Sequence, residues 1–454
     1  MLQVFLAYLV GLGPYLALAL LLGIGIPLVL LFSKPSRWLV PTLVLFTCLI
    51  ALGGGGSAVA GAEGSMSRQI TWGGSFLVSL FFCLNFKQKG ARFPVELVPA
   101  SYFLLIFFSI VSFAWAFNPA VSLKRSIQLV GVLLIAMALV NQKRGENVVT
   151  QFASPAFFLL LLGVVALAAP SISLDTDGNY RGFTFTKNVW GQFALFSSIV
   201  FLFSAIEKKG FNKWWGAFLF SSASLFATRS ATSIVIYFGV IGISFFMYLY
   251  DKYRGRMYIS AYAAISIFSV CVFSYFLIEG SLHSDRLVNA GFRSVGKDVT
   301  LTGRTELWEM MFREIARHPW LGTGYGSFWL GLDGLSREIF LVFSWRPGQA
   351  HNGYIDIINE IGLVGFFVFL FVIFVHVKKI YELFCSGQKN FVVMHFGILI
   401  SALLLNVSES SALRTTHLWW IVLSISIFDV HSRLRGGALK ASCVTDAVDK
   451  EVVS

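Results

Sequence analysis

Charged side chains are scarce in this chain of 454 residues, because Asp, Glu, Lys and Arg together make up only 13% of it. A soluble domain averages about 25%. Hydrophobic residues reach 56%, the mean hydropathy is +0.75, and the apolar residues come in long runs. These properties exclude an ordinary soluble protein and predict a multi-spanning integral membrane protein.

Cysteine and clustered metal ligands are also scarce. The five cysteines form no CxxC motif and have no histidine nearby at metal-ligand spacing (Cys48, Cys83, Cys271, Cys385 and Cys443). No cluster of histidines and carboxylates has the spacing of a metal site. We therefore expect no disulfide framework, no structural zinc, no catalytic metal and no cofactor.

The net charge of +12 raises the question of a nucleic-acid partner, but no segment has the character of a nucleic-acid module. In a membrane protein a basic excess more often reflects Lys and Arg in cytoplasmic links. The first residues lack a basic start and a small-residue cleavage site, so Leu2–Leu31 is interpreted as a retained span. We expect the lipid bilayer, and no nucleic acid, as a partner.

A membrane helix needs about 20 apolar residues. The candidate spans on this criterion are 5–32, 37–53, 70–86, 99–117, 121–140, 152–170, 188–206, 213–228, 231–250, 257–278, 352–376, 390–407 and 416–430. The sequence thus predicts an all-α integral membrane protein with about 12–13 transmembrane helices. One long loop, 279–350, separates two of them.

The links between the spans fall into two alternating sets that differ in charge. One set, which includes the links at 34–37, 208–213 and 378–389 and the tail, carries 20 Lys and Arg. The other set carries 7 in its short links, which hold Arg181, Arg229 and Arg414. Basic residues in short links mark the cytoplasmic side. The second set and the long loop are therefore expected outside the cytoplasm.

Four polar segments stand out on that outer side. They are Tyr180-Arg181-Gly182-Phe183-Thr184-Phe185-Thr186-Lys187-Asn188, Thr302-Gly303-Arg304-Thr305-Glu306-Leu307-Trp308, His318-Pro319-Trp320-Leu321-Gly322-Thr323-Gly324-Tyr325-Gly326 and Ala350-His351-Asn352-Gly353-Tyr354. Three or four arginines and a histidine close to membrane depth suit an anionic, lipid-linked ligand. Arginine offers phosphate a planar fork, and a neutral histidine can accept a proton from a hydroxyl group.

Each segment also has a purely structural interpretation. Arg181 and Lys187 are also compatible with ordinary charges at a helix end, and His351 with a helix cap. The stretch from Arg304 to Arg317 has the apolar period of an amphipathic helix at the membrane surface, with Arg304 at its start. The Gly322-x-Gly324-x-Gly326 run follows no strand and favours a tight loop over a phosphate site.

Three further polar residues lie in or near the spans. Arg229 stands in a very short turn between two spans, where an unpaired charge is expensive, so a functional role is the default hypothesis. His376 and His395 lie in or beside spans toward the cytoplasmic side and are interpreted as structural.

Taken in order, these motifs resemble the O-antigen ligase superfamily, which includes lipopolysaccharide O-antigen ligases and bacterial polysaccharide polymerases. The residues that carry the resemblance are Arg181-Gly182-Phe183 with Lys187-Asn188, Gly303-Arg304-x-x-x-Trp308, His318-Pro319 with Gly322-x-Gly324-x-Gly326-x-Phe328, and His351-Asn352 with Glu360-x-Gly362-x-x-Gly365. The resemblance divides the chain into N-terminal membrane helices (1–170), a catalytic membrane region (171–430) containing the periplasmic loop 279–350, and a cytoplasmic tail (431–454).

The resemblance implies a GT-C-like, metal-independent, inverting glycosyltransferase of the bacterial inner membrane. It would move a glycan from an undecaprenyl-diphosphate carrier to a hydroxyl of a glycan or lipid A core acceptor at the periplasmic face. Arg181 and Arg304 would hold the diphosphate and His351 would serve the acceptor. The residues expected to bind substrate are Lys187, Asn188, Arg229, Arg293 and Asn352.

Three alternatives stay open at this stage. Arg293 is a second candidate for the role given to Arg304. The motifs do not separate ligases from polymerases. A flippase for the same lipid-linked sugar, or a non-catalytic scaffold, would also be a membrane protein, but a transporter typically shows polar residues within its spans and two related halves.

Overall fold

The computed structural model describes residues 39–51, 73–80 apart from 75 and 78, 98–142, 148–208, 210–253 and 302–452. All the regular elements in these ranges are helices, and the single β contact among them is an isolated bridge between Leu174 and Tyr180. The expected all-α class is confirmed. The helices are α4 (Leu39–Ala51), α6 (Ala100–Val111), η5 (Ser112–Ala114), α7 (Pro119–Gln142), η6 (Val149–Phe152), α8 (Ala153–Val165), η7 (Ala166–Ala168), α9 (Pro170–Ser173), α10 (Lys187–Glu207), α11 (Lys213–Ala227), α12 (Ala231–Tyr253), α14 (Thr302–Arg317), η8 (Gly331–Asp333), α15 (Arg337–Val342), α16 (Gly353–Cys385), α17 (Lys389–Ser408) and α18 (Leu418–Val452).

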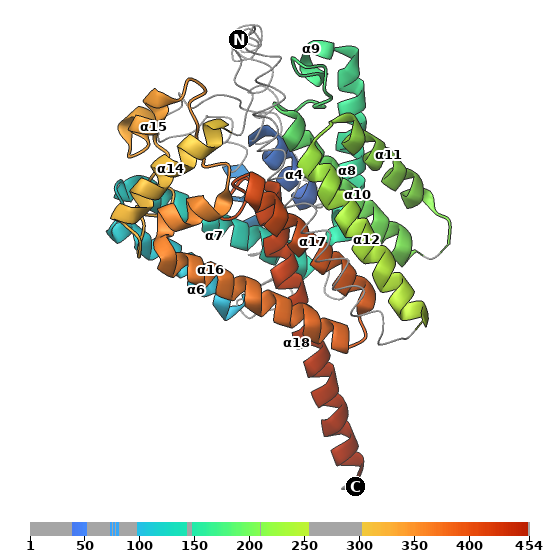
Figure 1. Ribbon diagram of the computed structural model, residues 1–454. Helices are drawn as coiled ribbons and strands as arrows, with labels where there is room; N and C mark the ends of the chain where they lie inside the picture. Colours follow the sequence, from blue (N-terminus) through green and yellow to red (C-terminus); the bar gives the residue numbers. More distant parts are fainter. Residues whose placement is uncertain are drawn as a thin grey trace, which may run out of the picture.

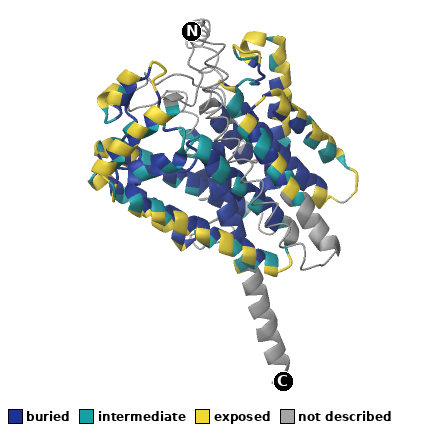
Figure 2. Cartoon of the chain, in the orientation of Figure 1, coloured by how far each residue is buried: buried dark blue, intermediate teal, exposed yellow. Residues whose placement is uncertain are grey.

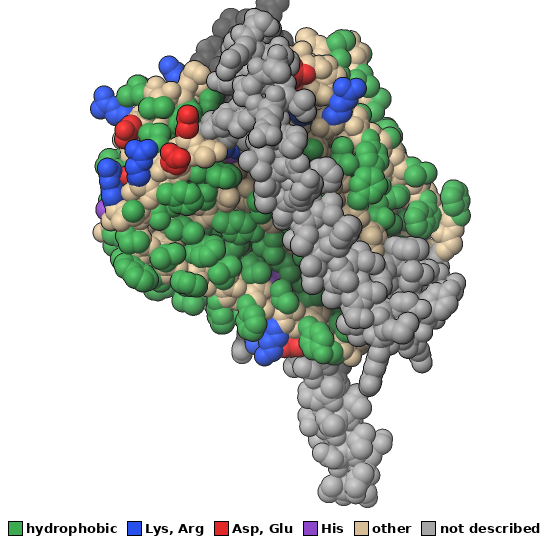
Figure 3. Space-filling model, viewed as in Figure 1, with side chains coloured by type: hydrophobic (Ala, Val, Ile, Leu, Met, Phe, Trp, Pro, Cys, Tyr) green, Lys and Arg blue, Asp and Glu red, His purple; other side chains and the backbone are tan. Residues whose placement is uncertain are grey.

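Several of these helices have the length and composition of membrane spans, which confirms a multi-pass membrane protein. Within the described ranges, five are long and apolar enough to cross a bilayer: Pro119–Asn141, Val149–Ala168, Lys187–Glu207, Gly353–Cys385 and Phe391–Ser408. Figure 3 shows a broad band of hydrophobic side chains between charged ones at the upper left and at the lower edge. The expected spans at 5–32 and 257–278 lie outside the described residues, so the total of 12–13 stays a prediction.

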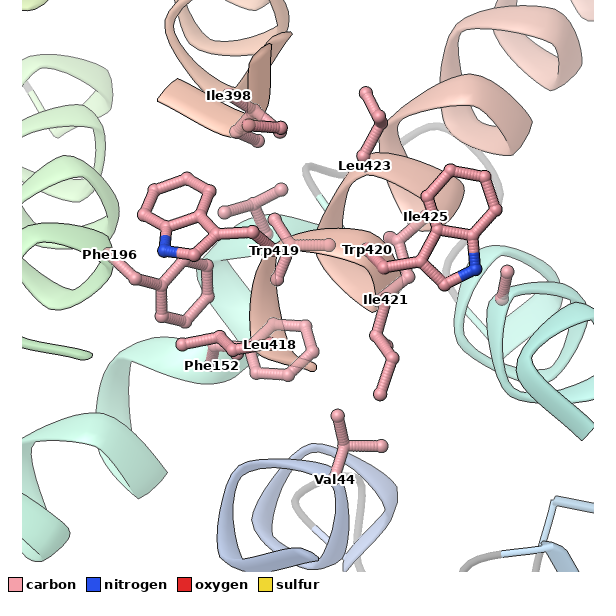
Figure 4. Close-up of a cluster of buried hydrophobic side chains, with 14 of the residues drawn as sticks. Val44, Phe152, Phe196, Ile398, Leu418, Trp419, Trp420, Ile421, Leu423 and Ile425 are labelled. Carbon is pink, nitrogen blue, oxygen red and sulfur yellow. The ribbon is translucent and has the colours of Figure 1, made fainter. Parts of the chain in front are cut away.

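Aromatic side chains fill the centre of the bundle. Trp419 and Trp420 begin α18 and are essentially fully buried. Trp419 packs edge to face against Phe196 of α10, with 6.2 Å between the ring centroids. Trp420 stacks on Tyr102 of α6, with 6.0 Å between the ring centroids. Figure 4 shows the two indoles pointing to opposite sides of α18, and Figure 2 shows the buried residues concentrated in the middle of the molecule. Helix α18 thus packs against α10 on one side and α6 on the other.

The histidines of the helices are tied into this interior. His376 of α16 and His395 of α17 are both buried, and both lie within hydrogen-bond distance of the hydroxyl of Ser426 on α18. His395 also lies 3.3 Å from a carboxylate oxygen of Asp429. These contacts join three helices, which supports the structural interpretation of both histidines.

Two antiparallel arrangements bring the polar segments to one end of the molecule, which we call the loop face. Helices α10 and α11 run in opposite directions, so the turn at 228–230 returns to the start of α10, where Ser230 donates to Asn188. Helices α16 and α17 also run in opposite directions, so Glu409, which follows α17, lies beside His351 just before the start of α16. Figure 1 shows α9, α14 and α15 on the upper side and the C-terminus at the opposite end.

Helix α14 corrects one expectation. It is amphipathic and Arg304 lies in its first turn, as predicted. Its apolar residues, however, pack onto protein: Leu307 and Met311 are fully buried in a second core at the loop face. The other members of this core are Phe328, Trp329, Ile339, Phe343, Ala350 and Ile355. The apolar face of α14 therefore supports the loop that leads to His351, rather than lying on the membrane.

Helix α16 is broken at Gly362, whose φ of 67° and ψ of −176° are not helical. The amides of Leu363 and Val364 bond to the carbonyls of Pro319 and Trp320 instead of to their own helix. The freed carbonyl of Asn359 accepts from the amide of Thr323. The glycine run at 322–326 therefore fills the break in α16, which favours the tight-loop interpretation of that run.

Candidate functional site

His351 and Glu409 form the centre of the site. Nδ1 of His351 lies 3.1 Å from Oε2 of Glu409, and the side-chain amide of Gln349 donates to the same oxygen at 2.9 Å. Both side chains are mostly buried, with 22% of His351 and 18% of Glu409 exposed. A carboxylate at Nδ1 favours the tautomer with hydrogen on that nitrogen, which leaves a lone pair on Nε2. The pair therefore has the arrangement of an oriented general base.

The local backbone fixes the direction of the His351 ring. His351 has a φ of 51°, a conformation that is costly for a residue with a side chain. The next residue, Asn352, is the N-cap of α16 and accepts from the amides of Tyr354 and Ile355. On the other side, the indole of Trp308 donates to the carbonyl of Ala350 at 2.8 Å. The ring of Trp345 lies 5.5 Å from that of His351.

Arg304 lies beside this pair. Its Nη1 approaches the carbonyl of Ser408 at 3.5 Å, one residue before Glu409. Burial by itself would raise the pKa of Glu409, but the hydrogen bond and charge of His351, with the charges of Arg304 and His417, outweigh it and lower the pKa. Glu409 is therefore anionic at neutral pH. Among the described residues Arg304 makes only the long bond to Ser408, so most of its donors can serve a ligand.

Behind the His351–Glu409 pair lies an ionic cluster centred on Arg414. Its Nη2 is 3.0 Å from Oδ2 of Asp356, and its Nη1 is 3.1 Å from Oε1 of Glu360. Burial would lower the pKa of Arg414, but the two carboxylates outweigh this and raise it. The cluster lines a small cavity together with Tyr325. Both carboxylates are almost fully buried, so the cation is needed to stabilise them.

Arg181 lies in a separate part of the loop face. Its guanidinium donates to the carbonyls of Ile172, Phe185 and Ser171 at 3.0, 3.1 and 2.8 Å. These bonds fold the segment 171–186 around the side chain. Within the described part of the chain, two of the five guanidinium N–H groups have no partner and can serve a ligand.

Three residues predicted to bind substrate lie where the start of α10 meets the turn between α11 and α12. Lys187 and Asn188 begin α10, and Asn188 accepts from the hydroxyl of Ser230 at 3.3 Å. Arg229 is exposed, has a φ of 51°, and its guanidinium has no hydrogen-bond or ion-pair partner within the described residues. The structure thus forms two groups: Arg181, Lys187, Asn188 and Arg229 in one, and Arg304 with His351 in the other.

Asn352 and Arg293 are the remaining residues predicted to bind substrate. Asn352 uses its side-chain oxygen to cap α16, so its amide hydrogens are what it can offer to substrate. Arg293 lies outside the described residues, as does the part of the long loop from 279 to 301.

The acidic residues at the loop face are bonded to neighbouring protein groups. No group of three His, Cys, Asp or Glu side chains in the described part of the chain could hold a metal ion. One DxD sequence, Asp175-Thr176-Asp177, precedes Arg181. Oδ1 of Asp175 accepts from the amides of Asp177 and Asn179, which makes this segment a turn closed by its own carboxylate.

Sequence reasoning missed Glu409 and the Asp356–Glu360–Arg414 cluster. Glu409 is 58 residues from His351, and no local pattern connects them. The available signal was charge at the ends of spans: Glu409 and Arg414 are the charged residues of the link between α17 and α18, and Asp356 and Glu360 stand one turn apart at the start of α16.

Comparison with known proteins shows which proteins this chain resembles. Residues 216–370 match the family model described as O-antigen ligase, a range that contains Arg229, Arg304 and His351. The chain is also 27% identical over 277 residues to the exopolysaccharide production protein ExoQ of Rhizobium meliloti (strain 1021). That alignment covers 59% of this chain and 62% of ExoQ. The resemblance that the motifs indicated is thus confirmed: this membrane protein is similar to the O-antigen ligase and polymerase family of polysaccharide assembly.

Proposed function

We propose that the protein is a glycosyltransferase that moves a glycan from an undecaprenyl-diphosphate carrier to a hydroxyl acceptor. The observation that carries the proposal is the His351–Glu409 pair beside Arg304: Nδ1 of the histidine is 3.1 Å from the carboxylate, and Arg304 reaches the backbone one residue before Glu409. A base and a cation at one place suit a reaction in which a hydroxyl attacks and a diphosphate leaves.

In the proposed reaction, Nε2 of His351 accepts the proton of the acceptor hydroxyl while that oxygen attacks the anomeric carbon. The bond from the anomeric carbon to the diphosphate oxygen breaks, and the diphosphate leaves on its lipid. Attack opposite to the leaving group inverts the anomeric centre. Glu409 stabilises the imidazolium that forms. Arg304, together with Arg181 of the other group, would balance the charge that develops on the diphosphate.

The acceptor we propose is a second lipid-linked glycan, so that the product is a longer polysaccharide. The support is the similarity to a protein named for exopolysaccharide production. Lipid A core is the alternative acceptor. Purified protein supplied with an undecaprenyl-diphosphate oligosaccharide alone should release undecaprenyl diphosphate and form longer glycans, also in EDTA. Product formed only when lipid A core is added would identify a ligase. Lipid-linked sugar that crosses vesicle membranes unchanged would identify a flippase.

We place the loop face in the periplasm and the protein in the inner membrane. The basis is the excess of Lys and Arg in the opposite set of links. Alkaline phosphatase fused after Leu332 should be active, and the same enzyme fused after Arg435 should be inactive. The reverse pattern would put the site in the cytoplasm and remove this part of the proposal.

A further inference from the structure

The loop between α17 and α18 carries both Glu409 and Arg414, and it is fastened to α16 at two places. Glu409 meets His351, which stands two residues before α16. Arg414 meets Asp356 and Glu360, in the first turns of α16. The distance between Nδ1 of His351 and the Glu409 carboxylate is therefore set by the same two segments that the Arg414 ion pairs hold together.

Asp356 connects the ionic cluster directly to the histidine segment. Its carboxylate accepts from the amide of Ala350, the residue before His351, at 3.2 Å. It also accepts from the indole of Trp329 at 2.8 Å. An Asp356 side chain that lost its cation would be a buried, unpaired charge, and its bonds to the backbone beside His351 would shift with it.

The other side of the Arg414 loop is held by the glycine run. The hydroxyl of Tyr325 donates to the carbonyl of Leu413, and the amide of Gly326 donates to Glu360 at 2.9 Å. From the last turn of α17, the side-chain oxygen of Asn406 accepts from the amides of Ser411 and Ala412 in the loop. Arg414 is thus the charged centre of this support, and its guanidinium meets two carboxylates of α16.

We infer that Arg414 is a positioning residue: through its ion pairs with Asp356 and Glu360 it holds Glu409 in place against His351. This inference rests on the proposed function, because it assigns Arg414 a role through the proposed base. Arg414 touches neither the acceptor nor the diphosphate in this account. A displacement of a catalytic group by about 1 Å can lower a rate about 100-fold, so loss of the ion pairs should lower kcat and leave donor binding unchanged.

The test is a double-mutant cycle on kcat of the purified full-length protein, with the undecaprenyl-diphosphate oligosaccharide as substrate. The variants are Arg414→Ala, Glu409→Gln and the two together. If Arg414 acts through Glu409, Arg414→Ala lowers kcat about 100-fold alone and has almost no effect when Glu409 is already Gln. Equal fold-losses in both backgrounds would overturn the inference.

Arg414→Ala leaves two buried carboxylates without their cation, so Arg414→Lys is tested in parallel. Lysine keeps the charge but cannot reach both carboxylates with a planar fork. A well-folded Arg414→Lys protein should show a reduced kcat with unchanged donor affinity, and again no added loss beside Glu409→Gln. A wild-type kcat in Arg414→Lys, or a kcat loss matched by lost donor affinity, would contradict the positioning role.

The matched control is Arg433→Lys. Arg433 is also a buried arginine paired with a carboxylate, Asp429, at 3.0 Å, but it lies in α18 away from the loop face. Its effect on kcat should be the same in both Glu409 backgrounds. The cycle also separates the two proposals: a Glu409→Gln protein with wild-type kcat would refute the base of the proposed function, whereas additivity with Arg414 would refute only the positioning role.

Discussion

Nδ1 of His351 and Oε2 of Glu409 lie 3.1 Å apart, although 58 residues separate them: His351 precedes α16 and Glu409 follows α17. The side-chain amide of Gln349 donates to the same carboxylate oxygen. The imidazole is thereby held through Nδ1, and Nε2 has no hydrogen-bond partner among the described residues. This relationship is the basis for treating His351 as a base. The alternative that His351 caps α16 is wrong, because Asn352 is the N-cap.

Replacing Glu409 with Gln tests the carboxylate of this pair. Gln keeps the size and a hydrogen-bonding oxygen but cannot stabilise an imidazolium by charge. Proton transfer by a positioned side chain contributes about 100- to 10,000-fold, so we expect kcat to fall by about 100-fold or more, with donor affinity unchanged. Glu382→Gln, which breaks the ion pair with Lys379 near the far end of α16, is the control and should leave kcat unchanged. A fully active Glu409→Gln protein would contradict the pair's role.

Alanine variants of Arg181 and Arg229 should differ in their effects on protein stability and on donor binding. Arg181 donates to three carbonyls of its own loop, and one net hydrogen bond contributes about 1 kcal/mol. Arg181→Ala should therefore lower the melting temperature as well as donor affinity. Arg229→Ala removes an exposed guanidinium and should lower donor affinity alone. Thermal melts and donor binding, measured on the same preparations, check both. An unchanged melting temperature in Arg181→Ala would show that its loop is held by other contacts.

Gly362 and Gly322 should not tolerate alanine. Gly322 has a φ of 69°, and a Cβ there would stand 2.6 Å from the backbone of Glu360. At Gly362 the added atom would stand 2.2 Å from the carbonyl oxygen of Trp320. We expect either substitution to reduce the yield of folded protein sharply, because backbone cannot move aside as a side chain can. Gly216→Ala on α11, where nothing lies within 4 Å, should express normally. Normal yields of the Gly322, Gly362 and Gly216 variants alike would contradict the close packing of the glycine run against the break in α16.

The folded protein should lose stability in mild acid because of His417. Burial, with the charge of Arg414, lowers the pKa of His417 to about 4 against the opposing effect of Glu409. The unfolded chain takes up this proton near pH 6.5, so stability is full above that pH and falls as the pH drops toward 4. The slope for one group is at most about 1.4 kcal/mol per pH unit. Glu409, with its lowered pKa, adds a loss below its ordinary pKa of 4.5. Melting temperatures between pH 7.5 and 4.5 should show a smaller slope in His417→Gln; an identical slope would exclude His417 as the cause.

Sequence alone predicted the local parts of this account. Composition and hydrophobic period within short stretches of sequence were enough to predict them. They are the spans at 188–206 and 390–407, the amphipathic helix that begins near Arg304 and the polar segment at His351. The Glu409 partner of His351 was not predictable, because it depends on how α16 packs against α17. The break in α16 was not predicted, because a single glycine, Gly362, in a long apolar run does not indicate a break. The apolar face of α14 was assigned to lipid because its period does not reveal that Phe328 and Trp329 return to cover it.

The measurement that tests the central claim most directly compares His351→Ala with Arg304→Ala, each assayed for binding of the undecaprenyl-diphosphate oligosaccharide and for glycan transfer. Both proteins must first elute as folded, monodisperse species in detergent. We predict that His351→Ala binds the donor as wild type does but transfers no glycan. Arg304→Ala should bind the donor more weakly and lose about 3–4 kcal/mol of transition-state stabilisation, or two to three orders of magnitude in rate. Glycan transfer by His351→Ala at the wild-type rate would contradict the account, because His351 would then have only a structural role before α16.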